Sequence, residues 1–300
     1  MPLIRAAVCD PEAKQAWVSS SRYAADLYDA GVKLGCKEDL IEIERQLQRC
    51  SKMKCITLPH VNGSTAKYRN PIYHDKKSKC REPFIDFKVY WQLVHCQPNA
   101  RLKFIPRITT AAPFSKIENM DYMEELDGDP EGPRGTLEWE VKGPCTHHAM
   151  AHTMASVAKT IQKKQVGAKC GRHIKLLAQE PAYTPAMETM FKEIGKFDIV
   201  GKYGASGFAE LDDNCIVFAP FVNAPVKQTV ADLARPAVII CNQIEEPIYH
   251  EARAPRSSNP ESPRTRQMWR DYDQQRFPIS ADLGPLAGHV CNLYIYSRRT

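Results

Sequence analysis

The feature that most constrains the fold is a regular alternation of strand and helix signals across residues 136–300. Short runs rich in Ile, Val and Phe end at polar loops, and segments with helical spacing of apolar residues lie between them. This order is typical of an α/β fold, and it predicts a Rossmann-like, mainly parallel sheet flanked by helices. The expected strands are 137–141, 174–179, 198–200, 215–219 and 237–241, and the expected helices are 147–158, 187–194 and 226–234. A final strand over 290–296 is expected to join the sheet in antiparallel orientation.

The first 116 residues predict an N-terminal elaboration of this domain. Helices are expected over 10–31 and 37–49, and the second has Leu40, Ile43 and Leu47 at helical spacing. The Pro-, Asn- and Lys-rich residues 51–82 predict an extended loop, and residues 84–91 allow a strand or a short helix, with the strand favoured. An acidic linker or lid over 117–135 is then expected to lead into the domain of residues 136–300, in which residues 251–266 predict a surface loop.

Composition and cysteine usage predict a soluble, cytoplasmic protein. The 300 residues are 43% hydrophobic and 25% charged, as in ordinary globular proteins. No apolar run approaches the roughly 18 residues that span a bilayer, and residues 1–30 lack a signal-peptide pattern. Eleven cysteines without CxxC spacing argue against a disulfide framework and favour a reducing compartment.

Metal and nucleic-acid binding find little support in the sequence. Cys50, Cys55 and His60 are irregularly spaced and lack an obvious fourth ligand, so no zinc site is expected. The net charge of +6 is accompanied by one basic stretch, residues 74–81, and a solvated loop is the simpler interpretation there. The expected partner is a small-molecule ligand, while the cofactor and the oligomeric state stay open.

Polar side chains beside the predicted sheet edge supply candidate catalytic residues. A helical wheel places His147 on the face that packs on the sheet, and in a first helical turn the helix dipole would keep its imidazole neutral. The alternative is a half-buried histidine bonded to a backbone carbonyl. Glu180 follows the second strand and Tyr183 lies three residues further on, so both could act in acid–base chemistry or hold ligand hydroxyls. Glu180 could instead cap the next helix.

Two amides complete the candidate site. Asn223 and Gln243 follow the fourth and fifth predicted strands, where they could bind a ligand's oxygen atoms. Because ligands of open α/β sheets gather outside the carboxyl ends of the strands, His147, Glu180, Tyr183, Asn223 and Gln243 are expected to line one crevice. His148 and His152 lie four residues apart on the outer helix face and could form a metal-binding pair. No acid or third ligand lies nearby in the sequence, so solvent exposure is the expectation. The sequence contains no GxSxG, Walker or HExxH motif.

The order of several motifs resembles a known family. Residues 178–184 (AQEPAYT), Gly195, Gly207-Phe208, residues 218–226 (FAPFVNAPV) and residues 233–240 (LARPAVII) resemble the fungal branch of the sensitivity-to-red-light-reduced (SRR-like) domain. The resemblance covers about residues 136–300 and implies a Rossmann-type fold with an acid–Pro pair after the second strand. It also implies a regulatory role, because family members are mostly described as regulators. The Gly-rich turn of the family is replaced here by Gly143-Pro144, which argues against dinucleotide binding.

These features lead to two hypotheses of function. The first is a protein that binds a small organic molecule and acts as a non-redox acid–base enzyme of fungal metabolism, of the isomerase or cyclase type. The second is a non-catalytic regulatory or metabolite-sensing protein that uses the same crevice without turnover.

Overall fold

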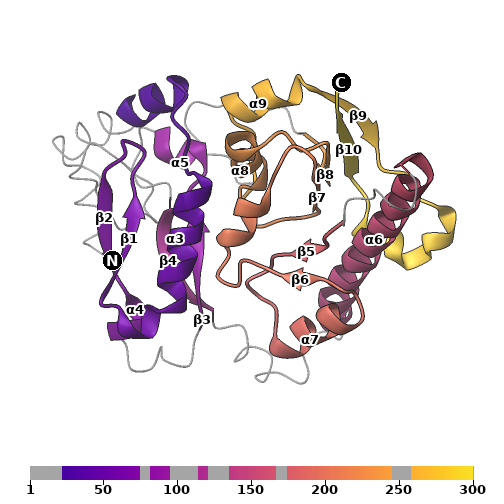
Figure 1. The fold of residues 1–300 in the computed structure, drawn as a ribbon, viewed down its shortest axis with the longest axis horizontal. Helices are drawn as coiled ribbons and strands as arrows, with labels where there is room; N and C mark the ends of the chain where they lie inside the picture. The colour runs from indigo at the N-terminus through magenta and orange to yellow at the C-terminus, as the bar shows by residue number, and fades with distance from the viewer. Residues whose placement is uncertain are drawn as a thin grey trace.

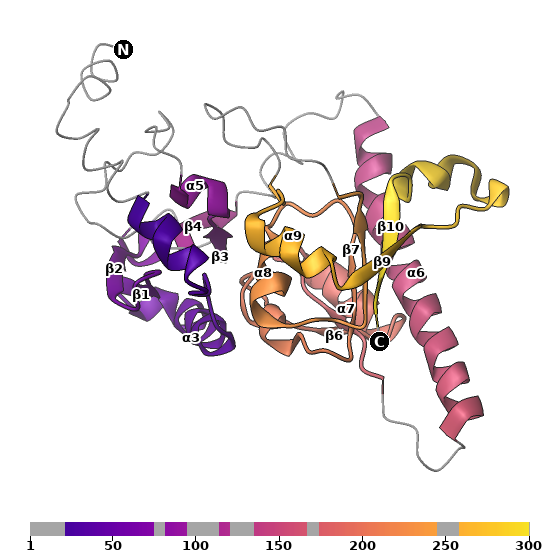
Figure 2. The same cartoon turned by 90° about the horizontal axis from the view of Figure 1, so that it is seen from above.

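A computed structural model of the chain describes residues 22–74, 82–94, 114–120, 135–166, 174–244 and 258–299. The described part is a mixed α/β structure of helices and small sheets. N-terminal elements lie on one side and C-terminal elements on the other in both views (Figures 1 and 2). Among the described helices, none combines the length and apolar composition needed to cross a bilayer.

The elements of the N-terminal half follow a helical segment over residues 22–29. They are α3 (Lys37–Gln48), η1 (Cys50–Lys52), β1 (Cys55–Pro59), β2 (Thr65–Arg69), α4 (Pro71–His74), β3 (Glu82–Phe87), α5 (Tyr90–Val94) and β4 (Phe114–Met120). Helix α3 is confirmed, and Leu40, Ile43 and Leu47 are all buried as their spacing predicts. The strand favoured for residues 84–91 is confirmed over residues 84–87, within β3, whereas residues 90 and 91 begin α5.

The prediction of an extended loop over residues 51–82 is wrong, because β1 and β2 form an antiparallel hairpin there. Ile56 and Leu58 of β1 are buried, whereas β2 has no buried residue, and this polar strand hides the hairpin signal in the sequence. Residues 117–120 of the predicted linker form the end of β4, which pairs with β3. The rest of that linker, up to residue 134, lies outside the described residues.

The C-terminal half contains the expected alternation of strands and helices, with one exception at its start. Its elements are α6 (Gly135–Val166), β5 (Leu177–Ala178), α7 (Pro185–Glu193), β6 (Asp198–Ile199), η3 (Ser206–Glu210), β7 (Ile216–Ala219), α8 (Val226–Leu233), β8 (Val238–Asn242), α9 (Pro263–Trp269), β9 (Tyr272–Arg276), η4 (Ala281–His289) and β10 (Leu293–Arg298). The predicted strand over 137–141 is wrong, since α6 covers it. Leu and Glu are good helix formers, and α6 continues through Pro144.

The strands form several small sheets rather than the single mainly parallel sheet expected of a Rossmann-like fold. Strands β5 and β6 form a separate parallel pair. The four-stranded sheet has the order β7-β8-β10-β9, with β7 and β8 parallel and β10 antiparallel to both of its neighbours. The antiparallel addition of the last strand is therefore confirmed.

The prediction of a surface loop over residues 251–266 is wrong for its last residues, 261–266, which are the start of α9 and the two residues before it. Ser262 caps α9 by accepting a hydrogen bond from the Thr265 N–H, and Pro263 occupies the first turn. Glu261 and Ser262 are both buried. Glu261 forms an ion pair with Lys227 of α8 at 2.6 Å, and it also accepts hydrogen bonds from Thr265 and Trp269.

The two halves share one hydrophobic core. A single buried cluster joins Leu40 and Ile56 of the N-terminal half to Phe208, Val230 and other residues of the C-terminal half. We call the boundary between the N-terminal and C-terminal halves the seam. Polar contacts reinforce it, since Arg264 pairs with Asp232 and donates to the carbonyl groups of Tyr28 and Val32.

Glu44 of α3 makes the most concentrated polar contact across the seam. Its buried carboxylate accepts backbone hydrogen bonds from Tyr203 at 3.0 Å and from Ala205 and Ser206 at 3.2 Å each. These donors lie in the glycine-rich loop of residues 201–207, where Gly201 has a φ of 59° and lies against the Gln179 side chain. A side chain at Gly201 would meet both a backbone penalty and a clash.

Candidate functional site

Helix α6 directs two adjacent histidines into two different aromatic clusters. Because successive residues of a helix are about 100° apart around its axis, His147 and His148 contact different neighbours. His147 faces β7 and η4, whereas His148 faces α7 and the start of β6. In both overall views η4, the yellow segment before β10, lies beside α6 (Figures 1 and 2).

His147 is a half-buried, neutral histidine. Its Nε2 lies 2.7 Å from the His289 carbonyl oxygen, and because a carbonyl only accepts, Nε2 carries the hydrogen. Burial lowers the pKa of His147, while the bond to the His289 carbonyl opposes that shift. The Nδ1 lone pair has no partner among the residues that the structure describes, so it can accept a hydrogen bond or a proton.

Two sequence-based statements about His147 have different outcomes. Its lower exposure relative to His152 is confirmed, since His147 is half-buried and His152 is exposed. Its predicted position in a first helical turn is wrong, because α6 begins at Gly135. Burial rather than the helix dipole therefore keeps the imidazole neutral, and the alternative of a histidine bonded to a carbonyl matches the observed geometry.

Phe221 forms an aromatic surface together with His147. It lies in the turn after β7, its ring is 6.0 Å from that of His147 with an interplanar angle of 24°, and 47% of the residue is exposed. Phe218 meets the same imidazole edge-on at 6.0 Å. The backbone φ of Phe221 is 49°, and its N–H donates to Asn242 Oδ1 at 2.8 Å. A left-handed conformation is unusual for a bulky residue, so this turn is strained.

His148 lies in the second cluster and is not solvent-facing, so that expectation is wrong. Its ring stacks on Phe191 at 3.8 Å with an interplanar angle of 15°, and Phe197 lies 5.3 Å away. His148 Nε2 also shares a hydrogen bond with the Tyr183 hydroxyl. The prediction allowed for one packed face of this helix, whereas Phe191 of α7 packs on a second face of α6, at His148.

Tyr183 and Glu180 lie on the His148 side of the molecule. Burial, together with the charge of Glu180, raises the pKa of Tyr183, so its phenol stays protonated and can donate to His148. Glu180 is exposed and accepts a hydrogen bond from the Ala182 N–H at 3.0 Å. It does not cap α7, because the Thr184 hydroxyl does so by accepting from the Met187 N–H at 3.3 Å.

Asn223 and Gln243 occupy the loops that follow β7 and β8, as expected, and both are exposed. The Gln243 N–H donates to the Asn292 carbonyl at 3.1 Å. The structure thus pairs Tyr183 with His148 and His147 with Phe221, and among the described residues no hydrogen bond joins these two groups. A single crevice lined by all five predicted residues stays a prediction.

Sequence reasoning missed Phe221, His148 and Asn242 as parts of the candidate site. The adjacent histidines were a usable signal for His148, because neighbouring residues of a helix that packs on two sides can both be buried. The Phe221 turn offered only a weak one, an aromatic residue after Pro220 in a loop that follows a strand. Nothing in the sequence indicates that Asn242 would fix that turn from the neighbouring strand.

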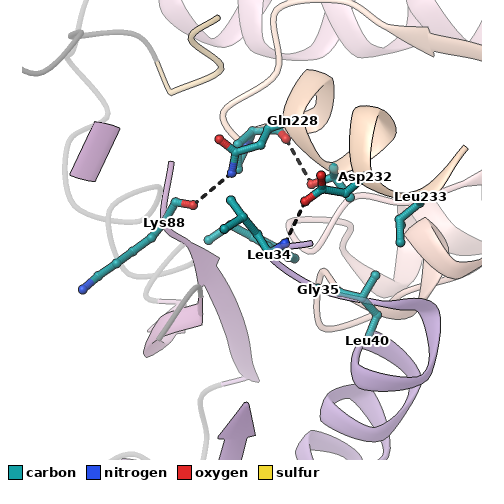
Figure 3. A pocket seen from close by; sticks show the side chains of 10 residues that line it. Leu34, Gly35, Leu40, Lys88, Gln228, Asp232 and Leu233 are labelled. Atoms are coloured by element: carbon teal, nitrogen blue, oxygen red, sulfur yellow. Dashed lines mark hydrogen bonds between the residues drawn. The ribbon is translucent and has the colours of Figure 1, made fainter. Parts of the chain in front are cut away.

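Two cavities lie at the seam between the halves, and none of the five predicted site residues lines either of them. One, lined by Leu34, Gln228 and Asp232 among others, has about 20 Å³ and could hold a single water but no organic ligand (Figure 3). There the Leu34 N–H donates to Asp232, and the Gln228 amide donates to the Lys88 carbonyl. The other, at the ends of α8 and α9, has about 290 Å³.

The described residues contain no group of three or more His, Cys, Asp or Glu side chains that could hold a metal ion. Comparisons of the chain with protein-family models, with curated proteins and with solved structures find no match.

Proposed function

We propose that the chain binds a small organic molecule on the aromatic surface of Phe221 and His147, at the carboxyl end of β7. The observation that carries this proposal is the strained, half-exposed Phe221. A left-handed backbone costs a bulky residue about 1–2 kcal/mol. A residue that is 47% exposed contributes little to the core in return. Strain of this kind gathers at ligand sites, where it presents a side chain for binding.

The chemistry of the surface favours a planar ligand. Phe221 offers a ring face, and planar conjugated groups stack on such faces in offset geometry. The Nδ1 atom of His147 can accept a hydrogen bond. Two exposed amides lie nearby in sequence: Asn223 follows β7, as Phe221 does, and Gln243 directly follows the last residue of β8. A planar molecule with hydrogen-bonding groups at its edge fits this combination better than a highly charged one, because the imidazole is neutral.

Binding without turnover, as in a regulatory or metabolite-sensing protein, fits the geometry best. The Tyr183 hydroxyl is bonded to His148, and Glu180 is exposed in its own turn, so neither contacts the His147 imidazole. A second candidate function is a non-redox isomerase or cyclase. The neutral His147 with an unbonded Nδ1 favours it, since such an atom can take a proton from a bound substrate.

The order of motifs further leads us to infer that residues 136–300 form an SRR-like, Rossmann-type domain. Two β-helix-β units support this inference. The parallel pair β5 and β6 is connected through α7, and the parallel pair β7 and β8 is connected through α8.

Native mass spectrometry of the purified protein after incubation with a fungal metabolite extract tests the proposal. We expect a bound small molecule on the wild-type chain and on Ile194→Ala, a control at an exposed apolar residue outside the surface. His147→Ala should weaken its retention. The released molecule should be recovered unchanged, whereas a changed mass or a rearranged isomer after incubation would favour the enzyme. Equal retention by wild type and His147→Ala would contradict the proposed site.

A further inference from the structure

The larger cavity at the seam is a candidate for a second, separate ligand site. It is open to solvent on one side. The turn before α3 borders it through Gly31 and Lys33, and the ends of α8 and α9 border it through Arg235, Arg264 and Asp271 among others. Its volume of about 290 Å³ approaches that of small-ligand pockets. At about 30 Å³ for each water-sized group, it could hold roughly ten non-hydrogen atoms.

Two of the charged groups that line this cavity are already neutralised. Arg264 pairs with Asp232, whose other carboxylate oxygen accepts from the Leu34 N–H at 2.8 Å. This pair fixes one wall and leaves little charge for a ligand.

The remaining charges leave an excess of positive charge. Arg235 donates from Nη1 to the Ala231 and Ala234 carbonyl groups, which neutralises the negative end of α8 and orients the guanidinium. Lys33 lies within ion-pair distance of no acid among the described residues. The Asp271 carboxylate likewise forms no hydrogen bond or ion pair there. The lining thus offers two cations, Lys33 and Arg235, against one carboxylate.

We propose that this cavity, the seam cavity, binds a small organic anion through a carboxylate or phosphate group held by Lys33 and Arg235. Guanidinium and ammonium groups are the usual partners of both anions. Because its walls come from both halves, an occupied cavity would stabilise their association. The site shares no residue with the Phe221 surface, so either proposal can fail without the other.

Isothermal titration calorimetry with malonate, inorganic phosphate and neutral glycerol tests this proposal. Malonate or phosphate should bind to the full chain and glycerol should not, and the stronger of the two anions identifies the preferred group. Two variants change the charge of the lining in opposite directions. Lys33→Glu should weaken anion binding about tenfold or more, because it replaces an attractive charge with a repulsive one. Asp271→Asn should strengthen anion binding a few-fold, because it removes a negative charge that repels the anion.

Lys67→Glu is the matched control, since Lys67 is an exposed lysine on β2 outside the cavity. It carries the same change of net charge and should leave the affinity unchanged. The proposal is overturned if neither anion binds, if glycerol binds as well as they do, or if Lys67→Glu weakens binding as much as Lys33→Glu. It is also overturned if Asp271→Asn weakens binding while the variant remains folded by circular dichroism.

Discussion

Replacing Glu44 should disrupt the seam between the two halves more than any other single change on α3. Its carboxylate accepts three backbone hydrogen bonds, and the residue is only 4% exposed. A hydrogen bond to a charged group contributes about 1.5–3 kcal/mol, and such bonds in one cluster are not additive. Glu44→Ala leaves three backbone donors without this acceptor, so we expect it to lower the free energy of unfolding by about 3–5 kcal/mol.

Glu44→Gln should cost less, about 2–3 kcal/mol, because one side-chain oxygen remains as an acceptor. The matched control is Glu42→Gln on the same helix, an exposed residue whose carboxylate pairs with Arg45. It should leave the denaturation midpoint unchanged, since exposed ion pairs contribute little.

Urea-induced unfolding followed by tryptophan fluorescence measures these changes. Hydrogen exchange of the Tyr203, Ala205 and Ser206 amides adds a local readout, because Glu44→Ala should deprotect them ahead of the four-stranded sheet. If Glu44→Ala and Glu42→Gln unfold at the same urea concentration, or if the three amides keep their protection, the reasoning is refuted.

Three further predictions concern single residues. Because burial lowers the pKa of His147 below its ordinary value of 6.5, the unfolded chain protonates first and stability should fall as pH drops below 6.5. In urea titrations His147→Gln should flatten this fall; an equal effect of His152→Gln would argue against it. Thr184→Ala should lower the free energy of unfolding by about 1 kcal/mol, because it removes the hydroxyl that caps α7. Thr184→Ser keeps a capping hydroxyl, so an equal loss of stability in that variant would exclude the cap as the cause. Burial raises the pKa of Cys241 to about 12, so iodoacetamide should modify the exposed Cys291 but spare Cys241 until the protein unfolds, as peptide mapping can show.

Elements whose residues pack locally on one face could be predicted well. The spacing of Leu40, Ile43 and Leu47 predicts α3, and the apolar run at 237–241 predicts β8. The start of α6 could not be predicted, because alternating residues at 137–141 imitate a strand and Pro144 suggests a break. How the strands divide into sheets depends on pairing between distant segments, which periodicity does not report.

The candidate site was predictable in part for the same reason. The inward direction of His147 follows from helical geometry, and the structure confirms it. The electrostatic environment of His147 does not follow from helical geometry, because the influence of the helix dipole depends on where α6 begins. The conformation of Phe221 depends on Asn242, a residue on the neighbouring strand, so no local pattern could indicate it.

The most direct test of the central claim compares Phe221→Gly with Phe221→Ala in ligand retention and stability. Glycine adopts the 49° φ without strain, whereas alanine keeps the strain and lacks the ring, so the glycine variant should be the more stable by about 1 kcal/mol. Both variants should lose the small molecule that wild type retains in native mass spectrometry. Retention by Phe221→Gly, or a glycine variant less stable than the alanine variant, would contradict a strained aromatic surface built for a ligand.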